Sequence, residues 1–240
     1  MVVPDRAIER ALAVVAHPDD VDFWAGGTVA SWASAGIAVA YLVLTDGDSG
    51  GFDPRIPRSA IPDIRRDEQE AAAAELGVDD VRFLGYPDGR LAPSYDLRRD
   101  ITRVIRQVRP ERVLTWTPEW SWRRFHRNHP DHRAVGEAVL SAVFPDARNP
   151  FAHPELLREE ALEPWVVDEV WLMGAPSPNH YVDITDTFER KLAAIRAHKS
   201  QTAHRDRLEQ DLRERLAPNS QAAGLPAGRL AEAFQVVTIE

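Results

Sequence analysis

The chain has 240 residues, 44% of them hydrophobic and 28% charged, which is typical of a globular protein and excludes a disordered chain. The formal net charge of −9 disfavours nonspecific binding to nucleic acid or to an anionic membrane. Because the sequence has no cysteine, disulfides and thiol nucleophiles are excluded, and any transition-metal site must use histidine and carboxylate ligands.

Short β-branched patterns alternate with helical patterns along the chain. The expected strands are 11–16, 38–45, 80–85, 112–116, 168–173, 180–184 and 234–239. The expected helices are 26–35, 62–76, 97–109, 130–143, 186–200 and 204–216. This alternation predicts an α/β fold with a mostly parallel sheet and helices on both faces.

We expect residues 1–240 to form a single domain. The stretch 145–164 is rich in proline and charge and is expected to be a surface insertion, and 217–229 is expected to be a loop. The best apolar run near the start, 11–16, is shorter than a secretory signal or a membrane helix requires, so we expect a cytoplasmic protein.

Polar, titratable residues follow four of the expected strands. They occupy positions 17–20, 45–48, 86–89 and, after a longer segment, 129–132. Because ligands bind beyond the carboxyl ends of strands in open α/β sheets, these segments should meet at one edge of the sheet. Two of them contain a histidine–proline–aspartate triplet, which a set of ordinary polar loops does not explain.

His132 begins the apolar stripe of the helix predicted at 130–143. Val135, Val139 and Val143 follow it at i+3, i+7 and i+11, so the imidazole should point inward. A buried-facing histidine needs a partner. A metal ion is one candidate, and a carboxylate such as that of Asp20 is the other.

A catalytic zinc site uses three protein ligands and keeps one position for water. Two imidazoles and a carboxylate, those of His17, Asp20 and His132, are a common set. Asp19 is then the candidate general base for the water, whose pKa zinc lowers to about 7. His129 is the candidate that stabilises the oxyanion or protonates the leaving amine, and Asp131 the candidate that hydrogen-bonds His129 and sets its tautomer.

Candidate substrate contacts are less specific. Arg65 begins the inward stripe of its helix and is expected to hold a substrate hydroxyl or phosphate, although an i, i+3 ion pair with Glu68 explains it as well. Asp88 is either a substrate contact or an ordinary turn aspartate. Trp120, with Trp116 and Trp122, would form an aromatic wall for a sugar or acyl group.

The sequence resembles the LmbE-like, PIG-L-type N-acetylglucosaminyl de-N-acetylase family. The specific segments are AHPDD at 16–20 and HPDHRAVG at 129–136. Supporting segments are GGT at 26–28, Arg65-x-x-Glu68, PDG at 87–89, VDIT at 182–185 and KLAAIRAHKSQ at 191–201. The resemblance implies a Rossmann-like fold, one Zn²⁺ per chain on His17, Asp20 and His132, Asp19 as base and His129 at the oxyanion. Fe²⁺ is an alternative ion in the cell.

Two positions depart from the family pattern. Many members carry glutamate directly after the paired aspartates, where this chain has Val21 and then Asp22. Some members have a tyrosine two residues before His129, where this chain has Arg127, so a role for that tyrosine does not transfer. Asn128 is the neighbouring candidate for a substrate contact.

We therefore predict a zinc-dependent hydrolase that removes an acetyl group from the amide nitrogen of an N-acetylglucosamine-type sugar or conjugate. Water at the zinc attacks the acyl carbon, with Asp19 as base. The alternatives are a zinc amidase for a thiol or antibiotic conjugate, a metal-dependent phosphoesterase, and a non-catalytic nucleotide- or metal-binding module. The expected partner is a small-molecule amino sugar, with neither nucleic acid nor membrane, and a homo-oligomer stays open.

Overall fold

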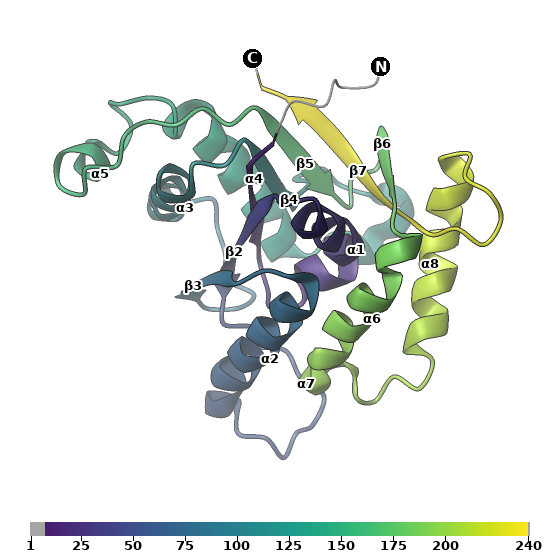
Figure 1. Ribbon diagram of the computed structural model, residues 1–240. Helices are drawn as coiled ribbons and strands as arrows, with labels where there is room; N and C mark the ends of the chain where they lie inside the picture. Colours follow the sequence, from purple (N-terminus) through teal and green to yellow (C-terminus); the bar gives the residue numbers. More distant parts are fainter. Residues whose placement is uncertain (1–7, 240) are drawn as a thin grey trace.

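The computed structural model describes residues 8–239, except the side chains of residues 126 and 127. Seven strands lie in one sheet: β1 Arg10–Val15, β2 Ala38–Thr45, β3 Asp80–Tyr86, β4 Arg112–Trp116, β5 Glu169–Met173, β6 His180–Asp183 and β7 Ala231–Thr238. The α-helices are α1 Asp20–Ser34, α2 Ile61–Leu76, α3 Tyr95–Val108, α4 Pro130–Ser141, α5 Pro154–Arg158, α6 Phe188–Ala197, α7 Lys199–Thr202 and α8 Leu208–Ala222. Figure 1 shows their arrangement.

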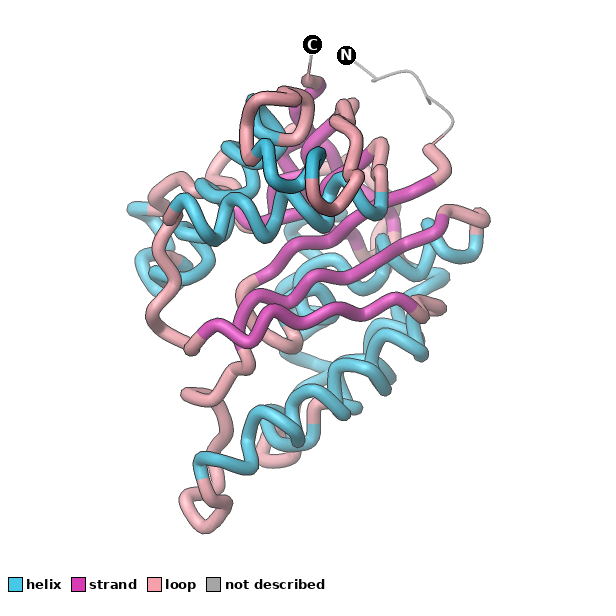
Figure 2. The backbone as a smooth tube through the Cα atoms, turned by 90° about the vertical axis from the view of Figure 1, so that its left-hand side faces the viewer, coloured by secondary structure: helices cyan, strands magenta, loops and turns pink. Residues whose placement is uncertain are grey.

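The sheet has the strand order β3-β2-β1-β4-β5-β7-β6. The five strands from β3 to β5 pair in parallel, whereas β7 runs antiparallel to both β5 and β6. Helices cover both faces of the sheet (Figure 2). The predicted mostly parallel, Rossmann-like α/β fold is therefore confirmed.

The central strand β1 contributes side chains to two separate apolar layers. Ala11, Ala13 and Val15 pack in a cluster with α1 and α2, and Leu12 and Val14 pack in a second cluster with α3 and α4. All five side chains are at most 1% exposed. A strand covered on both faces must be apolar throughout, which explains why its sequence does not alternate between polar and apolar residues.

Helices α1 and α8 differ from the sequence prediction, and the helix predicted at 186–200 is divided at His198 into α6 and α7. Helix α1 begins at Asp20 instead of residue 26, with two acidic residues in its first turn, where the helix dipole favours negative charge. Helix α8 continues through Pro218 to Ala222, so the loop predicted from 217 begins later. Its buried face, Leu208, Leu212, Leu216 and Ser220, repeats every four residues and carries the helix past the proline.

Helix α4, which carries His132, lies very close to the end of β4. A Cβ added to Gly136 would be 2.4 Å from the carbonyl oxygen of Trp116, so only glycine allows this approach. The predicted surface insertion at 145–164 includes α5 and is tied to α3, because Arg106 donates to the carbonyl oxygens of Asp146 and Asn149. Its status as an insertion, and the single-domain assignment, stay predictions.

A buried ion pair joins α6 to β7 and fixes α1 between them. Lys191 and Glu232 are 0% and 1% exposed, with 2.7 Å between Nζ and Oε1. The carboxylate also accepts the backbone N–H groups of Gly27 and Thr28 in α1. Among residues 8–239, no helix combines the length and apolar character needed to cross a membrane.

Candidate metal centre and active site

The first histidine motif forms a tight turn between β1 and α1. Asp19, the N-cap residue of α1, has a φ of 102°, in the left-handed region that non-glycine residues rarely adopt. The turn folds the carboxylate of Asp20 back over the strand end, where its Oδ2 accepts the N–H groups of Ala16 and His17 at 3.1 and 2.9 Å. This geometry brings the side chains of residues 17 and 20 together.

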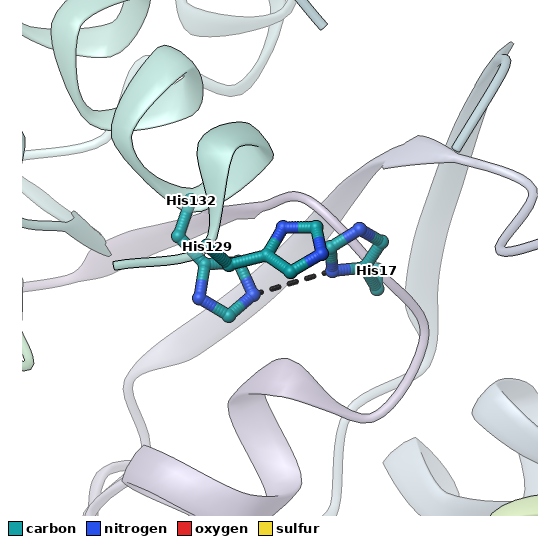
Figure 3. Close-up of side chains that lie close together, drawn as sticks. All are labelled: His17, His129 and His132. Carbon is teal, nitrogen blue, oxygen red and sulfur yellow. Dashed lines mark hydrogen bonds between the residues drawn. The ribbon is translucent and has the colours of Figure 1, made fainter. Parts of the chain in front are cut away.

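The second histidine motif meets the first because β1 and β4 are neighbours in the sheet. His17 Nδ1 and His132 Nε2 are 3.2 Å apart. His132 Nε2 is 3.1 Å from Asp20 Oδ1, and His17 Nδ1 is 3.7 Å from Asp20 Oδ2. Donor atoms of His17, Asp20 and His132 thus lie within 4 Å of one another, although His132 comes more than one hundred positions after the other two. Figure 3 shows the imidazoles of His17 and His132 close together, with that of His129 beside them.

These separations match the geometry of a metal site. Zinc–nitrogen and zinc–oxygen bonds of about 2.0–2.2 Å in a tetrahedron place the ligand atoms about 3.3–3.5 Å apart. Asp20 Oδ2 is occupied by hydrogen bonds, including one from the indole N–H of Trp116 at 3.0 Å, and this leaves Oδ1 toward His132. The 3.2 Å between His17 Nδ1 and His132 Nε2 and the 3.1 Å between His132 Nε2 and Asp20 Oδ1 are close to these values, so the three residues are candidate ligands of a divalent cation.

The far nitrogen of His17 is held by two carboxylates. His17 Nε2 lies 3.0 Å from Asp88 Oδ1 and 3.3 Å from Asp131 Oδ2. Burial by itself lowers the pKa of His17, but hydrogen bonds to Asp131, Asp20 and Asp88 outweigh it and raise the pKa well above its usual value. A carboxylate on the outer N–H of a ligand imidazole fixes its tautomer and aims the other nitrogen at the metal.

Two further sets of donors lie near the same point. His129 joins His17 and His132 in one group whose ligand atoms are all within 4.8 Å, and His17, Asp88 and Asp131 form another. Both groups contain His17. The first group uses its Nδ1, and the second uses its Nε2. We assign Asp88 and Asp131 to orientation of His17, because their oxygens face the Nε2 side of the ring.

Trp116 supports two members of the donor triangle. Its indole ring stacks on the imidazole of His132 with 3.8 Å between centroids and 7° between planes, and its N–H binds Asp20. The indole is 2% exposed. The sequence analysis grouped Trp116 with Trp120 and Trp122 as a substrate wall. Its contacts instead place it behind the metal centre.

Asp19 lies beside the donor triangle and is held from two sides. Its backbone N–H donates to Gln69 Oε1 at 2.8 Å, and its carboxylate Oδ2 is 3.2 Å from Arg65 Nη2. Burial raises the pKa of Asp19, and the positive charge of Arg65 opposes that rise. A carboxylate with a raised pKa accepts a proton more readily than an exposed one, as a general base must.

The predicted contact between Asp131 and His129 is wrong in its details. The carboxylate of Asp131 is 0% exposed, faces His17 and accepts N–H groups from Gly89 and Leu91. The backbone N–H of Asp131 instead donates to His129 Nδ1 at 3.3 Å, because His129 is the N-cap residue of α4. With Nδ1 as acceptor, the proton of the neutral ring lies on Nε2. Burial lowers the pKa of His129, as do the nearby His17 and His132 rings.

Two residues predicted as substrate contacts bind the protein itself in this structure, and their substrate roles stay predictions. Arg65 is 3% exposed and donates to the carbonyl oxygens of Pro18 and Gly47, so it supports the turn that carries Asp19. Glu68 instead accepts from Ser200, so the alternative ion pair between residues 65 and 68 is absent. Asn128 uses its amide within its own loop, on Ser121 and the carbonyl oxygen of Phe125. The side chain of Arg127 lies outside the described residues.

The sequence missed a buried network behind Asp19. Gln69 Nε2 donates to Asp22 Oδ2 at 2.9 Å, and His198 Nε2 lies 2.8 Å from the same oxygen. Gln69 follows Arg65 at i+4 on α2, so the helical period places both on one face. A second signal for this network was present in the sequence. Many family members have glutamate at the position of Val21, and this chain has its acidic residue one position later, at Asp22.

A cavity of about 680 Å³ opens near the metal centre, at the carboxyl ends of β4 and β5. Its walls include Trp24, Trp120 and Trp122, together with residues 174–178 that follow β5. Trp24 contacts Trp116 with 5.0 Å between ring centroids. Since Trp116 stacks on His132, one indole layer separates this cavity from the donor triangle.

Comparison with known proteins agrees with this arrangement. A sequence model of the PIG-L family, GlcNAc-PI de-N-acetylase, matches residues 12–143. A diacetylchitobiose deacetylase from Thermococcus kodakarensis is 34% identical over 205 residues, covering 82% of this chain and 72% of its own. A probable N-acetyl-α-D-glucosaminyl L-malate deacetylase 2 from Bacillus cereus is 36% identical, with coverages of 80% and 84%.

A solved structure agrees along almost the whole chain. The N,N′-diacetylchitobiose deacetylase from Pyrococcus horikoshii superposes with a TM-score of 0.89 at 31% identity, covering 98% of this chain and 85% of its own.

Proposed function

This chain belongs to the PIG-L, LmbE-like family of de-N-acetylases, and from that premise we propose that it hydrolyses the acetamide of an N-acetylglucosamine-type sugar or conjugate. The reaction consumes one water and releases acetate and a free amine. Similar proteins are named as deacetylases of diacetylchitobiose, of N-acetylglucosaminyl malate and of an acetamido-glucosyl inositol. Their shared feature is the acetylated amino sugar, which is the class of substrate proposed for this chain.

We propose Zn²⁺ as the ion, one per chain, held by His17 Nδ1, Asp20 Oδ1 and His132 Nε2. The neutral imidazoles and single carboxylate suit zinc, and they also accept Fe²⁺. Burial raises the pKa of Asp20, but the neighbouring His132 and His17 lower it well below its usual value, so this ligand stays ionised. When bound, the ion supplies Lewis acidity and lowers the pKa of a water to about 7.

The residues of the chain supply the proton transfers. Asp19, 19% exposed at its side chain, accepts a proton from the attacking water and returns it to the amine as the carbon–nitrogen bond breaks. His129 donates its Nε2 proton as a hydrogen bond to the acyl oxygen as negative charge develops there. The positive charge of Arg65, 3.2 Å away, favours the ionised form of Asp19 that a general base requires.

One observation carries this proposal: donor atoms of His17, Asp20 and His132 lie within 4 Å of one another, next to Asp19 in the same turn. A phosphoesterase that uses two ions needs a second full set of ligands. Asp88 and Asp131 are the other nearby carboxylates, and both are engaged with His17 Nε2. A binding module would not require Asp19 in its strained turn.

The test measures primary amine released from N-acetylglucosamine, diacetylchitobiose and N-acetylglucosaminyl conjugates, with and without a chelator. We expect turnover that the chelator abolishes and that one equivalent of zinc restores. Asp19→Asn should keep the metal and lose most turnover, whereas Asp63→Asn, an exposed change on α2, should match the wild type. Turnover in metal-loaded Asp19→Asn, or a need for two metal equivalents, would refute the scheme.

The cytoplasmic location, the absence of nucleic-acid and membrane partners, and the oligomeric state stay predictions.

A further inference from the structure

The segment 191–201 carries a sequence motif that the proposed mechanism does not use. It runs through α6 into α7, and α7 lies beside α2 (Figure 1), where Ser200 donates to Glu68. Helix α6 ends at His198, whose backbone φ and ψ are −76° and 62°. The imidazole of His198 is 0% exposed. A histidine buried to this degree needs a polar partner inside the protein.

The partner of His198 is the carboxylate of Asp22, in the first turn of α1. His198 Nε2 lies 2.8 Å from Asp22 Oδ2, and Gln69 Nε2 donates to the same oxygen at 2.9 Å. Within the described part of the chain, Asp22 Oδ1 has no hydrogen-bond partner. Two hydrogen bonds therefore hold this buried carboxylate, and His198 makes one of them.

The carboxylate of Asp22 decides which way the amide of Gln69 points. An ionised carboxylate only accepts hydrogen bonds, so it can face the amino end of the amide but not the carbonyl end. The carbonyl oxygen of Gln69 is thus left for the backbone N–H of Asp19, which donates to it at 2.8 Å. The reversed amide would place two donors, Gln69 Nε2 and the Asp19 N–H, against each other.

The turn at Asp19 depends on this acceptor. Asp19 has a φ of 102°, and a non-glycine residue keeps such a conformation only when its surroundings hold it. Three hydrogen bonds connect the His198 ring to the Asp19 backbone, and the residues that make them, Asp22, Gln69 and His198, are all 0% exposed. Loss of one bond in such a buried chain leaves a polar group without a partner and weakens the bonds next to it.

We propose that His198 is a positioning residue, which holds the carboxylate of Asp22 so that Gln69 keeps the turn at Asp19 in place. The inference rests on the proposed function where it treats Asp19 as the catalytic base. Because His198 acts through Asp19, its loss should lower kcat and leave KM and the metal affinity unchanged. It should also loosen the Asp19 backbone, which is measurable without any substrate.

The experiment measures two quantities on the protein loaded with one equivalent of zinc. The first is the hydrogen-exchange rate of the Asp19 backbone N–H, and the second is kcat with KM in the amine-release assay. In His198→Leu, which removes the donor, we expect this N–H to exchange about tenfold faster, as for the loss of one hydrogen bond. We expect kcat to fall about three- to tenfold at unchanged KM.

Two further substitutions of His198 separate the hydrogen bond from other effects of the change. His198→Gln places an amide N–H near the position of Nε2, so it should restore the exchange rate and kcat to near the wild-type values. His198→Asn is one methylene shorter and should not reach Asp22. It should therefore behave like His198→Leu, and it provides the test if leucine prevents folding.

Ile105→Ala is the control for a general loss of stability, because Ile105 is 0% exposed in the apolar cluster on the other face of the sheet. It should leave the Asp19 exchange rate and kcat unchanged. An unchanged exchange rate or an unchanged kcat in folded His198→Leu or His198→Asn overturns the positioning role, as does an equal effect of Ile105→Ala. A wild type that releases no amine from any of the substrates overturns the deacetylase proposal, and the exchange rates still decide whether His198 holds the turn.

Discussion

Gln69 on α2 accepts the backbone N–H of Asp19 at 2.8 Å, at the one residue of the catalytic turn whose φ is 102°. A non-glycine residue in such a conformation costs about 1–3 kcal/mol and persists only when its surroundings hold it. The same side-chain amide donates to Asp22 in the first turn of α1. Gln69 therefore acts as a positioning residue, since it holds the turn that aims Asp19 at the metal centre.

Replacement of Gln69 by leucine removes the acceptor and leaves a buried N–H without a partner. We expect the free energy of unfolding to fall by about 1–3 kcal/mol. We expect kcat to fall about tenfold or more with little change in KM, because the proposed base moves while the substrate contacts stay. Steady-state kinetics and urea unfolding measure both. Gln107→Leu, an exposed change on α3, is the control, and an unchanged kcat in folded Gln69→Leu would refute the positioning role.

Trp116→Phe tests the support behind the metal ligands. Phenylalanine keeps an aromatic face for His132 but removes the N–H that binds Asp20. We expect metal affinity to fall about 10–100-fold, as for other residues that orient metal ligands. Competition with a chromogenic chelator measures it. Trp32→Phe, a buried indole that instead contacts Trp171, should bind metal normally, and equal affinities for both variants would contradict the assignment.

His129→Ala removes the proposed donor to the oxyanion. The loss of one such donor costs about 3 kcal/mol in the barrier, which is about a hundredfold in kcat. Metal affinity should change little, because the donor triangle is complete without His129. Metal content and kcat measured on the same preparation separate the two effects, and wild-type turnover in this variant would remove His129 from the mechanism.

We expect Asp131→Asn to weaken metal binding, whereas His129→Ala lowers kcat. Its carboxylate faces His17 Nε2, so asparagine weakens the support of a metal ligand. We expect weaker metal binding, with activity restored at saturating zinc. A low kcat that excess zinc does not correct would instead indicate the role that the sequence first suggested for Asp131, which is to hold His129 in its catalytic tautomer.

His198 should make stability depend on pH. Its side chain and that of Asp22 are both 0% exposed and 2.8 Å apart. Burial lowers the pKa of His198, but the hydrogen bond to Asp22 outweighs it and raises the pKa above 6.5. A raised native pKa gives stabilisation that is complete below pH 6.5 and is lost as pH rises through the native value.

The comparison of wild type with His198→Gln isolates this contribution. We expect the difference in unfolding free energy between the two proteins to be largest near about pH 6 and to shrink toward about pH 9. Urea titrations over that range, with zinc at the same saturating concentration, measure it. A difference that stays constant or grows with pH would contradict the assigned direction of the pKa shift.

Local pattern was sufficient for most of the fold. The seven strands were found near their observed positions, and the buried strands β1, β2, β4 and β5 were found because each is a short, largely apolar run. The end of α8 was placed too early, because Pro218 indicates the end of a helix. The packing of the leucine face of α8 carries the helix past this proline to Ala222. The start of α1 was also missed, because its first turn contains acidic residues and lacks an apolar period.

The sequence by itself determined the family and singled out the residues proposed here as metal ligands, because both histidine motifs are contiguous and histidine and carboxylate are its available ligand types. Only the tertiary structure decided what the surrounding polar residues do. It assigned Arg65 and Gln69 to Asp19, Asp88 and Asp131 to His17, and Trp116 to Asp20 and His132. These partners come from different strands and helices, and spacing along one chain cannot specify which of them meet when the sheet brings their ends together.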